Sequence, residues 1–447
     1  MDFYLPEIHG RPKRNVRIPP EVDVAITPRV QAILDCSGMQ RLRRVSQLGL
    51  VALVYPGANH SRFEHSLGVY RLACQVLRHL MEVDEGFSAA LSEKQAKLFL
   101  IAALTHDIGH WPYCHPIEDM RLSWVPSHES LAREHLNAPE LAHAIHSMWQ
   151  IEPDEVADFL IHPQKSGIAQ VLQSALSGPV DIDKMDYLQR DSLHAGVPYG
   201  RNFDLGRLVA SLCVNDEKHK LAITGKGKTA TEMMVFARYV MFSEVYWHHA
   251  VRSATAMLQR LVYSSHPTAE LSKRWLYQSD MEFANDLVAA AQDSPVLKKL
   301  AGGLFGPRRV LFKRIAQFSF HENAALHSAL ARRPFDQLAS CAEQLADKLS
   351  RGLARPLLST DILIDAPPLK LEVQFALDVQ SMQQAADSTN RFRPLAELSP
   401  VVHSLATAQF DNFVKQVRVF AAPDRVAELN VDTALISEQL LDIASRF

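Results

Sequence analysis

The chain has 447 residues, 47% hydrophobic and 22% charged, and its 47 Lys and Arg residues nearly balance 50 Asp and Glu residues, for a formal net charge of −3. This composition predicts a folded protein with a large core, and it excludes a small stapled scaffold, a disordered tail and a strongly basic nucleic-acid binder. The five cysteines are scattered and never form a CxxC pair, which argues against a disulfide framework and a thiolate zinc site.

Neither an export signal nor a membrane span is predicted. The N-terminal segment carries acidic residues and lacks an apolar stretch of signal-peptide length, and the most apolar run, Leu98–Leu104, is too short to cross a bilayer. We therefore expect a cytoplasmic protein. The unusual number in the composition is 20 histidines, many of them crowded between His60 and His146.

Most of residues 28–300 has apolar residues at three- and four-residue spacing, which predicts a helical region. The predicted helical segments are Arg29–Leu48, Ser66–Val83, Ser92–Leu104, Ser127–Leu136, Glu155–Leu160, Ile168–Leu176 and Thr229–Tyr263.

The C-terminal part has a different pattern. After a Gly-rich break at Gly302–Pro307, strands are predicted at Asp361–Asp365, Lys370–Ala376 and Phe413–Phe420. The predicted organisation is an N-terminal arm (1–27), a helical core (28–300) and a C-terminal α+β lobe (301–447). The basic residues of the arm are interpreted as solvated; they are Arg11, Lys13, Arg14 and Arg17.

A histidine and aspartate constellation begins where the apolar helix around Leu98–Leu104 runs into His106 and Asp107, with His110 shortly after. An isolated His-Asp pair is weak evidence for a site, because such a pair also arises by chance. Imidazole nitrogen together with carboxylate oxygen suits a first-row divalent metal ion. The pair therefore needs partners elsewhere in the chain.

Two segments offer such partners. His65 follows Arg62 by three residues, so that both can share a helical face. Asp183, Tyr187 and Asp191 are spaced four apart and predict one stripe of a helix, with Lys184 beside them. The alternative is a set of surface ion pairs, such as Lys184 with Asp181.

In the order His65, His106–Asp107 and Asp183, the chain resembles the HD superfamily of metal-dependent phosphohydrolases. The flanking words resemble its deoxynucleoside triphosphate (dNTP) triphosphohydrolases, which are dGTPase-like, and in particular the catalytic core of the vertebrate SAM- and HD-domain enzyme without the SAM domain. These words are Gln40–Arg43, Gln47–Gly49, Pro56–Ala58, Arg62–Val69, His106–His110 and Asp181–Asp191. The resemblance runs from about Pro28 to about Lys313, with a weaker similarity at Val417–Phe420. It implies a mainly α fold with a helical HD core and a small α+β C-terminal lobe.

The resemblance also implies roles for individual residues. The metal ligands would be His65, His106, Asp107 and Asp183. His128 would be the acid/base group, with His110 and Glu118 nearby and a carboxylate, such as that of Glu129, holding its tautomer; the family commonly has Asp where this chain has Glu118. Phosphate charge would be offset by Arg62, Lys184 and Arg238. For the sugar and base, Gln47 and Asp191 would hold the 3'-hydroxyl, Leu48 and Tyr187 would pack near C2', and Tyr246 would line the pocket.

A nucleotide effector and a homo-oligomer are further expectations from the resemblance. Arg207, Arg309 and Lys313 match basic residues that bind nucleotide between subunits in the vertebrate enzyme. Glu244 and His249 stand where an arginine and a lysine are expected, so this site is altered. Nothing in the sequence supports a nucleic-acid partner.

The predicted function is cleavage of a dNTP to deoxynucleoside and triphosphate. One alternative is an HD phosphohydrolase for another nucleotide phosphoester. Another is a nucleotide- or nucleic-acid-binding regulator without turnover. Against a regulator, all four candidate metal ligands are present, whereas a degenerate site would be expected to have lost one. The metal is left open among manganese, iron, zinc, nickel, cobalt and magnesium, with a second magnesium ion on the triphosphate as an option. Five other histidines are interpreted as surface or core residues; they are His60, His79, His135, His143 and His146.

Overall fold

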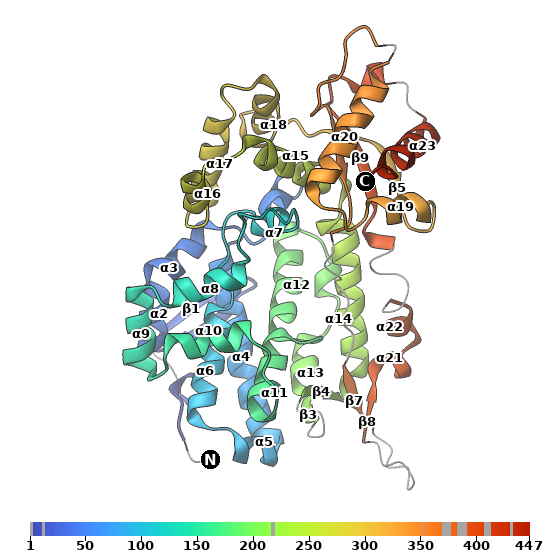
Figure 1. Cartoon of the computed structure of the whole chain (residues 1–447). Helices are drawn as coiled ribbons and strands as arrows, with labels where there is room; N and C mark the ends of the chain where they lie inside the picture. Colours follow the sequence, from blue (N-terminus) through green and yellow to red (C-terminus); the bar gives the residue numbers. More distant parts are fainter. Residues whose placement is uncertain are drawn as a thin grey trace.

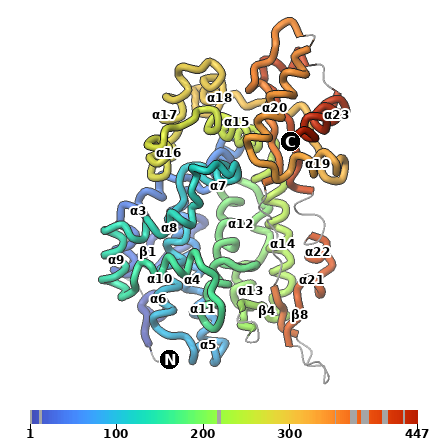
Figure 2. The backbone as a smooth tube through the Cα atoms, viewed as in Figure 1, coloured from blue at the N-terminus to red at the C-terminus, as the bar shows by residue number. Residues whose placement is uncertain are grey.

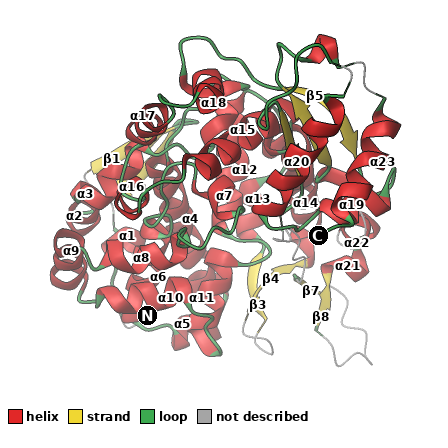
Figure 3. Ribbon diagram, turned by 45° about the horizontal axis from the view of Figure 1, so that its top comes forward, coloured by secondary structure: helices red, strands yellow, loops and turns green. Residues whose placement is uncertain are grey.

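The computed structural model describes residues 3–10, 14–215, 220–351, 353–368, 377–381, 391–405, 413–429 and 432–447. Helices dominate these residues, and the strands form three small sheets (Figures 1 and 3). The predicted mainly α fold class is therefore confirmed.

The first half of the chain is built from short and medium helices. Its elements are α1 Pro6–His9, β1 Arg14–Ile18, β2 Val22–Ile26, α2 Pro28–Asp35, α3 Ser37–Arg41, η1 Leu42–Arg44, η2 Gly49–Leu53, α4 Arg62–Val83, α5 Glu85–Ala90, α6 Glu93–Thr105, α7 Cys114–Glu118, α8 His128–Leu136, α9 Pro139–Trp149, α10 Pro153–Ile161, α11 Gly167–Ser177, α12 Ile182–Ala195, η3 Tyr199–Arg201, α13 Leu205–Ala210, β3 Leu212–Asn215 and β4 Lys220–Thr224.

The second half mixes helices with strands. Its elements are η4 Gly225–Gly227, α14 Lys228–Met241, the π-helical turn η5 Phe242–Tyr246, α15 His249–Ser265, α16 Ala269–Trp275, α17 Asp280–Ala290, α18 Pro295–Phe305, β5 Lys313–Phe318, α19 Ala324–Leu330, α20 Phe335–Leu349, β6 Ile362–Asp365, β7 Asp378–Gln380, β8 Phe392–Pro394, α21 Leu395–Leu398, α22 Pro400–Ser404, β9 Val417–Ala421, η7 Val426–Glu428 and α23 Thr433–Ala444.

Helix α4 is the centre of the first core. It packs against α6 and α12, and α12 in turn packs against α14 (Figure 1). Most side chains of α4 are buried, including apolar residues on every turn from Phe63 to Met81. A 22-residue helix that is buried along its length holds its side chains firmly, so it is a rigid support for polar groups at its N-terminal end.

The C-terminal sheet has the order β5-β9-β6, and β9 pairs antiparallel with both neighbours. Helix α20 packs on β6 and against α23, which gives this part its own apolar core. The strand prediction at Asp361–Asp365 is confirmed by β6, and β9 covers the end of the one at Phe413–Phe420. The strand predicted at Lys370–Ala376 lies outside the described residues.

The segment from Leu377 to Leu405 returns to the first core. Strands β7 and β8 join β3 and β4 in a four-stranded sheet, in which β4 and β7 run parallel. Apolar residues of this segment, such as Val379 and Val402, are buried in the same cluster as α4 and α6. The tube in Figure 2 shows the late part of the chain at two separate places, near α14 and near α20.

Most predicted helices are confirmed within a few residues, but two long ones are interrupted. The segment Arg29–Leu48 breaks at Cys36, whose backbone is extended, because the N–H and hydroxyl of Ser37 both donate to the Glu140 carboxylate at 2.8 and 2.7 Å. The segment Thr229–Tyr263 is broken by η5, after which the His248 side chain caps α15 by accepting from the Ala250 N–H.

The N-terminal segment contains a β-hairpin that the sequence pattern did not predict. Strands β1 and β2 pair antiparallel, and Val24 and Ile26 are buried while Arg14 and Arg17 are exposed. The exposed arginines agree with the prediction of solvated basic residues; Arg11 and Lys13 lie outside the described residues. Within the described ranges, no helix has the length and apolar character needed to cross a membrane.

Candidate metal centre and its surroundings

Three helices bring the predicted ligands together. His65 lies in the first turn of α4, His106 and Asp107 follow the last turn of α6, and Asp183 lies in the first turn of α12. Local capping sets these ends: Ser61 caps α4 and Asp181 caps α12 through their side chains. Polar ligands therefore sit where these three helices begin or end.

The ligand atoms converge on one point. Nε2 of His65 lies 3.1 Å from Nε2 of His106 and 3.0 Å from Oδ1 of Asp183. Asp107 Oδ1 lies 3.5 Å from His106 Nε2, and His65, His106 and Asp107 each offer a ligand atom within 4.8 Å of the others. Two imidazole nitrogens and two carboxylates facing each other at such distances form a donor set that suits a divalent first-row metal ion.

Backbone and side-chain acceptors orient both imidazoles. His106 Nδ1 lies 3.0 Å from the Ala103 carbonyl oxygen, and His65 Nδ1 lies 2.9 Å from Oδ2 of Asp186. Because these oxygens accept, each ring carries a proton on Nδ1, and Nε2 is the nitrogen that faces the centre and would bind a metal ion after losing any proton of its own. This tautomer is the one that a metal ligand requires.

The electric field at the centre favours positive charge. Burial would lower the pKa of His65, but hydrogen bonds to Asp183 and Asp186 raise this pKa to about 10. Burial would likewise raise the pKa of Asp107, yet His110, His106 and Arg62 hold that pKa well below its usual range. The four predicted ligands thus fit a bound cation in donor type, direction and charge.

Arg62 reaches the same centre from the start of α4. Its Nη1 donates to Oδ2 of Asp107 at 2.8 Å, and both side chains are buried. A buried guanidinium next to a metal site is an anion-binding group, because it adds positive charge where phosphate oxygens would approach.

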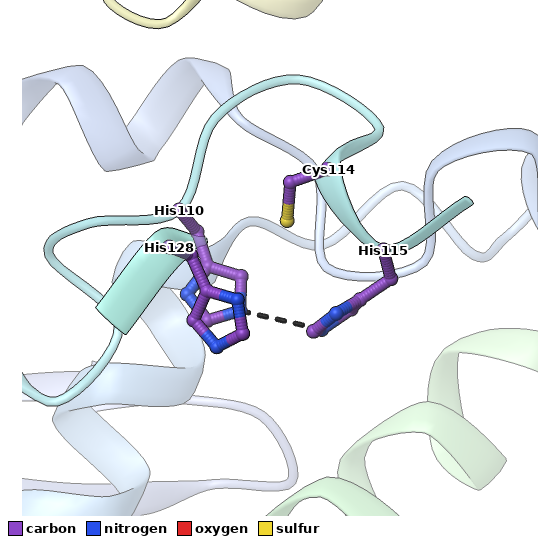
Figure 4. Close-up of side chains that lie close together, drawn as sticks. All are labelled: His110, Cys114, His115 and His128. Carbon is purple, nitrogen blue, oxygen red and sulfur yellow. Dashed lines mark hydrogen bonds between the residues drawn. The ribbon is translucent and has the colours of Figure 1, made fainter. Parts of the chain in front are cut away.

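A second group of ligand-type side chains lies beside the first and consists of His110, Cys114, His115 and His128 (Figure 4). Nε2 of His110 lies 3.3 Å from Nε2 of His115, and the rings of His110 and His128 are 4.0 Å apart. Burial raises the pKa of the Cys114 thiol to about 12, so this thiol stays protonated at neutral pH. The group therefore offers three imidazoles and a neutral thiol.

Glu118 is the carboxylate that orients His128. Both Glu118 oxygens lie 3.0 Å from His128 Nδ1, and Oε1 also accepts the His128 backbone N–H at 2.6 Å. Glu129 is the carboxylate that the sequence predicts to orient His128. It lies 3.5 Å from Nε2 of His128 and is exposed. That expectation for Glu129 is therefore corrected, because the turn between α7 and α8 folds Glu118 under His128.

Neighbouring charges keep Glu118 ionised, and burial keeps His110 neutral. Burial would raise the pKa of Glu118, but His115 and His128 hold it well below its usual range. Burial, followed by the charge of Arg62, lowers the pKa of His110 well below 6.5.

Gly109 lets this loop approach α8, because a Cβ there would lie 2.1 Å from the His128 carbonyl oxygen.

The predicted sugar-binding residues Asp191 and Tyr246 are in contact. Tyr246, at the end of η5, donates its hydroxyl to Oδ2 of Asp191 at 2.6 Å, and His60 Nε2 lies 2.9 Å from Oδ1. Gln47 donates its backbone N–H to the His60 carbonyl, and its own Oε1 is buried without a hydrogen-bond partner in the described part of the chain. Such an orphaned acceptor is what an incoming hydroxyl group would satisfy.

The remaining predicted contacts are arranged less uniformly. Lys184 donates to Oδ2 of Asp181 at 2.6 Å and to the Gly178 carbonyl, which is the ion pair of the alternative interpretation. Arg238 is buried on α14 with its guanidinium 5.5 Å from the Phe242 ring. Tyr187 and Leu48 are half-buried and pack against the first core.

Sequence reasoning assigned no role to two residues of this region, Asp186 and His115. Asp186 comes three residues after Asp183, so helical spacing could have placed it beside the ligand set. His115 follows His110 by five residues and lies against its ring. His60 is a buried histidine whose Nε2 lies against Asp191, which agrees with its interpretation as a core residue.

The helical fold and the convergent His and Asp side chains are those of an HD-type centre, and the cluster fits a metal ion. Comparison with protein families agrees: residues 62–190 match the HD domain, and residues 203–443 match the HD associated region. The chain therefore belongs to the family of HD-domain phosphohydrolases that carry the HD-associated region.

Individual relatives are more distant. An uncharacterized protein of Methanocaldococcus jannaschii is 28% identical over 413 residues, covering 91% of this chain and 79% of that protein. The human deoxynucleoside triphosphate triphosphohydrolase SAMHD1 is 27% identical over 275 residues, covering 55% of this chain and 43% of the human protein. The crystal structure of a phosphohydrolase from Bacteroides thetaiotaomicron superposes with a TM-score of 0.67 at 21% identity, covering 92% of this chain and all of that one, and shows the same fold.

Proposed function

We propose that this protein is a metal-dependent dNTP triphosphohydrolase that converts a dNTP and water to deoxynucleoside and inorganic triphosphate. The observation that carries the proposal is the convergence of His65, His106, Asp107 and Asp183 beside the buried Arg62. The similarity to a human enzyme named for this reaction supports the choice of substrate.

The four ligands would hold one divalent ion. When bound, such an ion polarises a phosphoryl oxygen and lowers the pKa of a coordinated water. In the reaction, the oxygen of water bonds to the α-phosphorus, the bond from that phosphorus to the sugar 5'-oxygen breaks, and the 5'-oxygen leaves with a proton.

His128 is the residue to which we assign delivery of that proton. Its Nδ1 is held by Glu118 at 3.0 Å, which leaves Nε2 to face the substrate. A positioned imidazole with an ionised carboxylate behind it is an effective proton donor near neutral pH. The neutral His110 packs against the His128 ring and limits its rotation.

The triphosphate requires cations on its side of the metal. Arg62 already lies at the centre, and Arg238 and Lys184 are assigned to the outer phosphates. Lys184 would exchange its contact with Asp181 for a phosphate oxygen, so its assignment depends on a side-chain movement that binding of substrate would drive.

The sugar would bind against α12. Asp191, held by Tyr246 and His60, and Gln47 would line the position of the 3'-hydroxyl, whose single proton one of these two acceptors takes. Leu48 and Tyr187 would pack close to C2' and exclude a 2'-hydroxyl. The proposal also includes a nucleotide effector, a homo-oligomer, a second magnesium ion on the triphosphate and a cytoplasmic location.

Product analysis tests the proposed reaction. The full chain, loaded with Mn2+ or Mg2+, is incubated with each dNTP and each NTP in turn, and the products are separated by anion-exchange chromatography. We expect deoxynucleoside and intact triphosphate from dNTPs only. Release of mono- or diphosphate instead, or cleavage of NTPs at equal rate, would favour an HD phosphohydrolase for another nucleotide phosphoester; no release at all with metal bound would favour a regulator.

A further inference from the structure

We propose that Asp186 is the positioning residue for the metal ligand His65. Oδ2 of Asp186 lies 2.9 Å from Nδ1 of His65, and both side chains are buried. Asp186 stands three residues after the ligand Asp183, so a single turn of α12 supplies one ligand and the orientation of another.

The carboxylate of Asp186 decides which nitrogen of His65 faces the metal. An ionised carboxylate only accepts hydrogen bonds, so the His65 proton is held on Nδ1. Nε2 is then the nitrogen that faces His106 and Asp183, which lie 3.1 and 3.0 Å away. Such an outer carboxylate also makes the imidazole a stronger donor to the metal.

Asp186 is itself held rigidly by Arg190. The guanidinium donates from Nε to Oδ2 at 2.8 Å and from Nη2 to Oδ1 at 2.7 Å, one helical turn along α12. The Nη1 atom of Arg190 donates to Oε1 of Glu64 at 2.6 Å, and Glu64 directly precedes His65 on α4. The two helices are thus locked by a closed set of charged hydrogen bonds that begins and ends beside the ligand.

Gly68 provides the space for this arrangement. It lies on α4 three residues after His65, and a Cβ at this position would come within 1.9 Å of Asp186 Oδ1 and 2.4 Å of Arg190 Nη2. Any larger residue at position 68 would displace the carboxylate from His65. A glycine in the middle of a helix weakens it by about 1 kcal/mol relative to alanine, so its presence here has a packing reason.

This inference rests on the proposed function only in requiring that the centre binds a divalent metal. Its test therefore measures metal affinity and not turnover. The full chain and the variants Asp186→Asn and Gly68→Ala are stripped with chelator, and the dissociation constant for Mn2+ is measured by calorimetry. We expect affinity about 10–100-fold weaker in both variants, which is the usual effect of losing such an outer partner.

The matched control is Asp365→Asn. Asp365 also binds a buried arginine, Arg252, through several hydrogen bonds, but it lies in β6, away from the ligands. This variant removes a comparable buried ion pair and should leave Mn2+ affinity unchanged. Equal weakening in Asp365→Asn and Asp186→Asn would reduce the role of Asp186 to general stability and overturn the inference.

Two further outcomes separate this inference from the proposed function. If the parent chain binds no Mn2+, the proposed metal centre and the inference fail together; if the parent and a folded Asp186→Asn bind equally well, only the inference fails. Should Asp186→Asn not fold, nitrogen NMR of the zinc-loaded parent decides, because the inference requires the His65 proton on Nδ1, and a proton on Nε2 would overturn it.

Discussion

Nε2 of His60 lies 2.9 Å from Oδ1 of Asp191, although 131 residues separate the two in the chain. His60 stands just before α4, and Asp191 lies on the third turn of α12, so this contact joins the same two helices that hold the metal ligands. The ring of His60 also stacks on that of His194 at 4.4 Å, which fixes its plane. Asp191 is therefore an acceptor whose direction is set from two sides, by His60 and Tyr246.

Replacing His60 should weaken substrate binding more than it affects the chemical step. In His60→Phe, Asp191 loses a charged hydrogen bond, which typically contributes about 1.5–3 kcal/mol, so kcat/KM for a dNTP should fall at least about tenfold, mainly through KM. Steady-state kinetics measures this. His79→Phe is the control, because the hydrogen bond of His79 within the described residues goes to the Leu212 carbonyl, and the substitution should change neither constant.

Glu118 and Glu129 make a paired test of proton transfer. Glu118→Gln replaces the ionised acceptor of His128 Nδ1 by an amide and should lower kcat by about 10²–10⁴-fold, the range typical of general acid catalysis. Glu129→Gln should have little effect, because Glu129 is exposed and 3.5 Å from His128 Nε2. Mn2+ affinity should be unchanged in both variants. A larger loss of kcat in Glu129→Gln than in Glu118→Gln would mean that Glu129, and not Glu118, orients His128.

The metal ligands can be tested without any assumption about substrate. In His106→Ala, one of two facing imidazoles is removed, and Mn2+ affinity should fall by more than about 100-fold, beyond the loss expected for an outer partner. The exposed His143 serves for comparison, since His143→Ala leaves the centre intact. Turnover that survives in a folded His106→Ala, Asp107→Ala double variant would exclude the proposed centre altogether.

The ligands could be predicted from the sequence because each lies in a short motif that contains residue types able to bind a metal ion. His106 and Asp107 follow the end of an apolar helix, and His65 and Asp183 each lie in the first turn of another helix. The resemblance to the HD family then grouped these residues into one predicted metal site. Helical periodicity alone also placed most of the helices of the core, since their apolar faces are strongly patterned.

The partners of the ligands could not be predicted in the same way. His60 and Asp191 are far apart in sequence, and only the packing of α4 against α12 brings them together. The turn η5 depends on tertiary contacts, because its residues continue a helical pattern and only the π-helical geometry turns Tyr246 toward Asp191. The return of β7 beside β4 is a long-range strand pairing without a local signal.

A buried histidine outside the metal centre predicts how stability depends on pH. Burial, followed by the charge of Arg41, lowers the pKa of His135 from 6.5 to about 3. Below pH 6.5 the unfolded chain takes up a proton at this position and the folded chain does not. The contribution of His135 to the free energy of unfolding is therefore fully present above about pH 6.5 and is lost progressively as pH falls toward 3. At pH 5 the loss from this one group is about 2 kcal/mol.

His135→Phe should remove that loss. Urea unfolding of metal-free parent and variant at pH 8 and pH 5 gives the free energy of unfolding for each, and the parent should lose about 2 kcal/mol more than the variant between these two values. The exposed His146 is the control: His146→Phe should follow the parent. Equal losses in the parent and His135→Phe would mean that His135 is protonated in the folded protein, with the Arg41 side chain turned away from it.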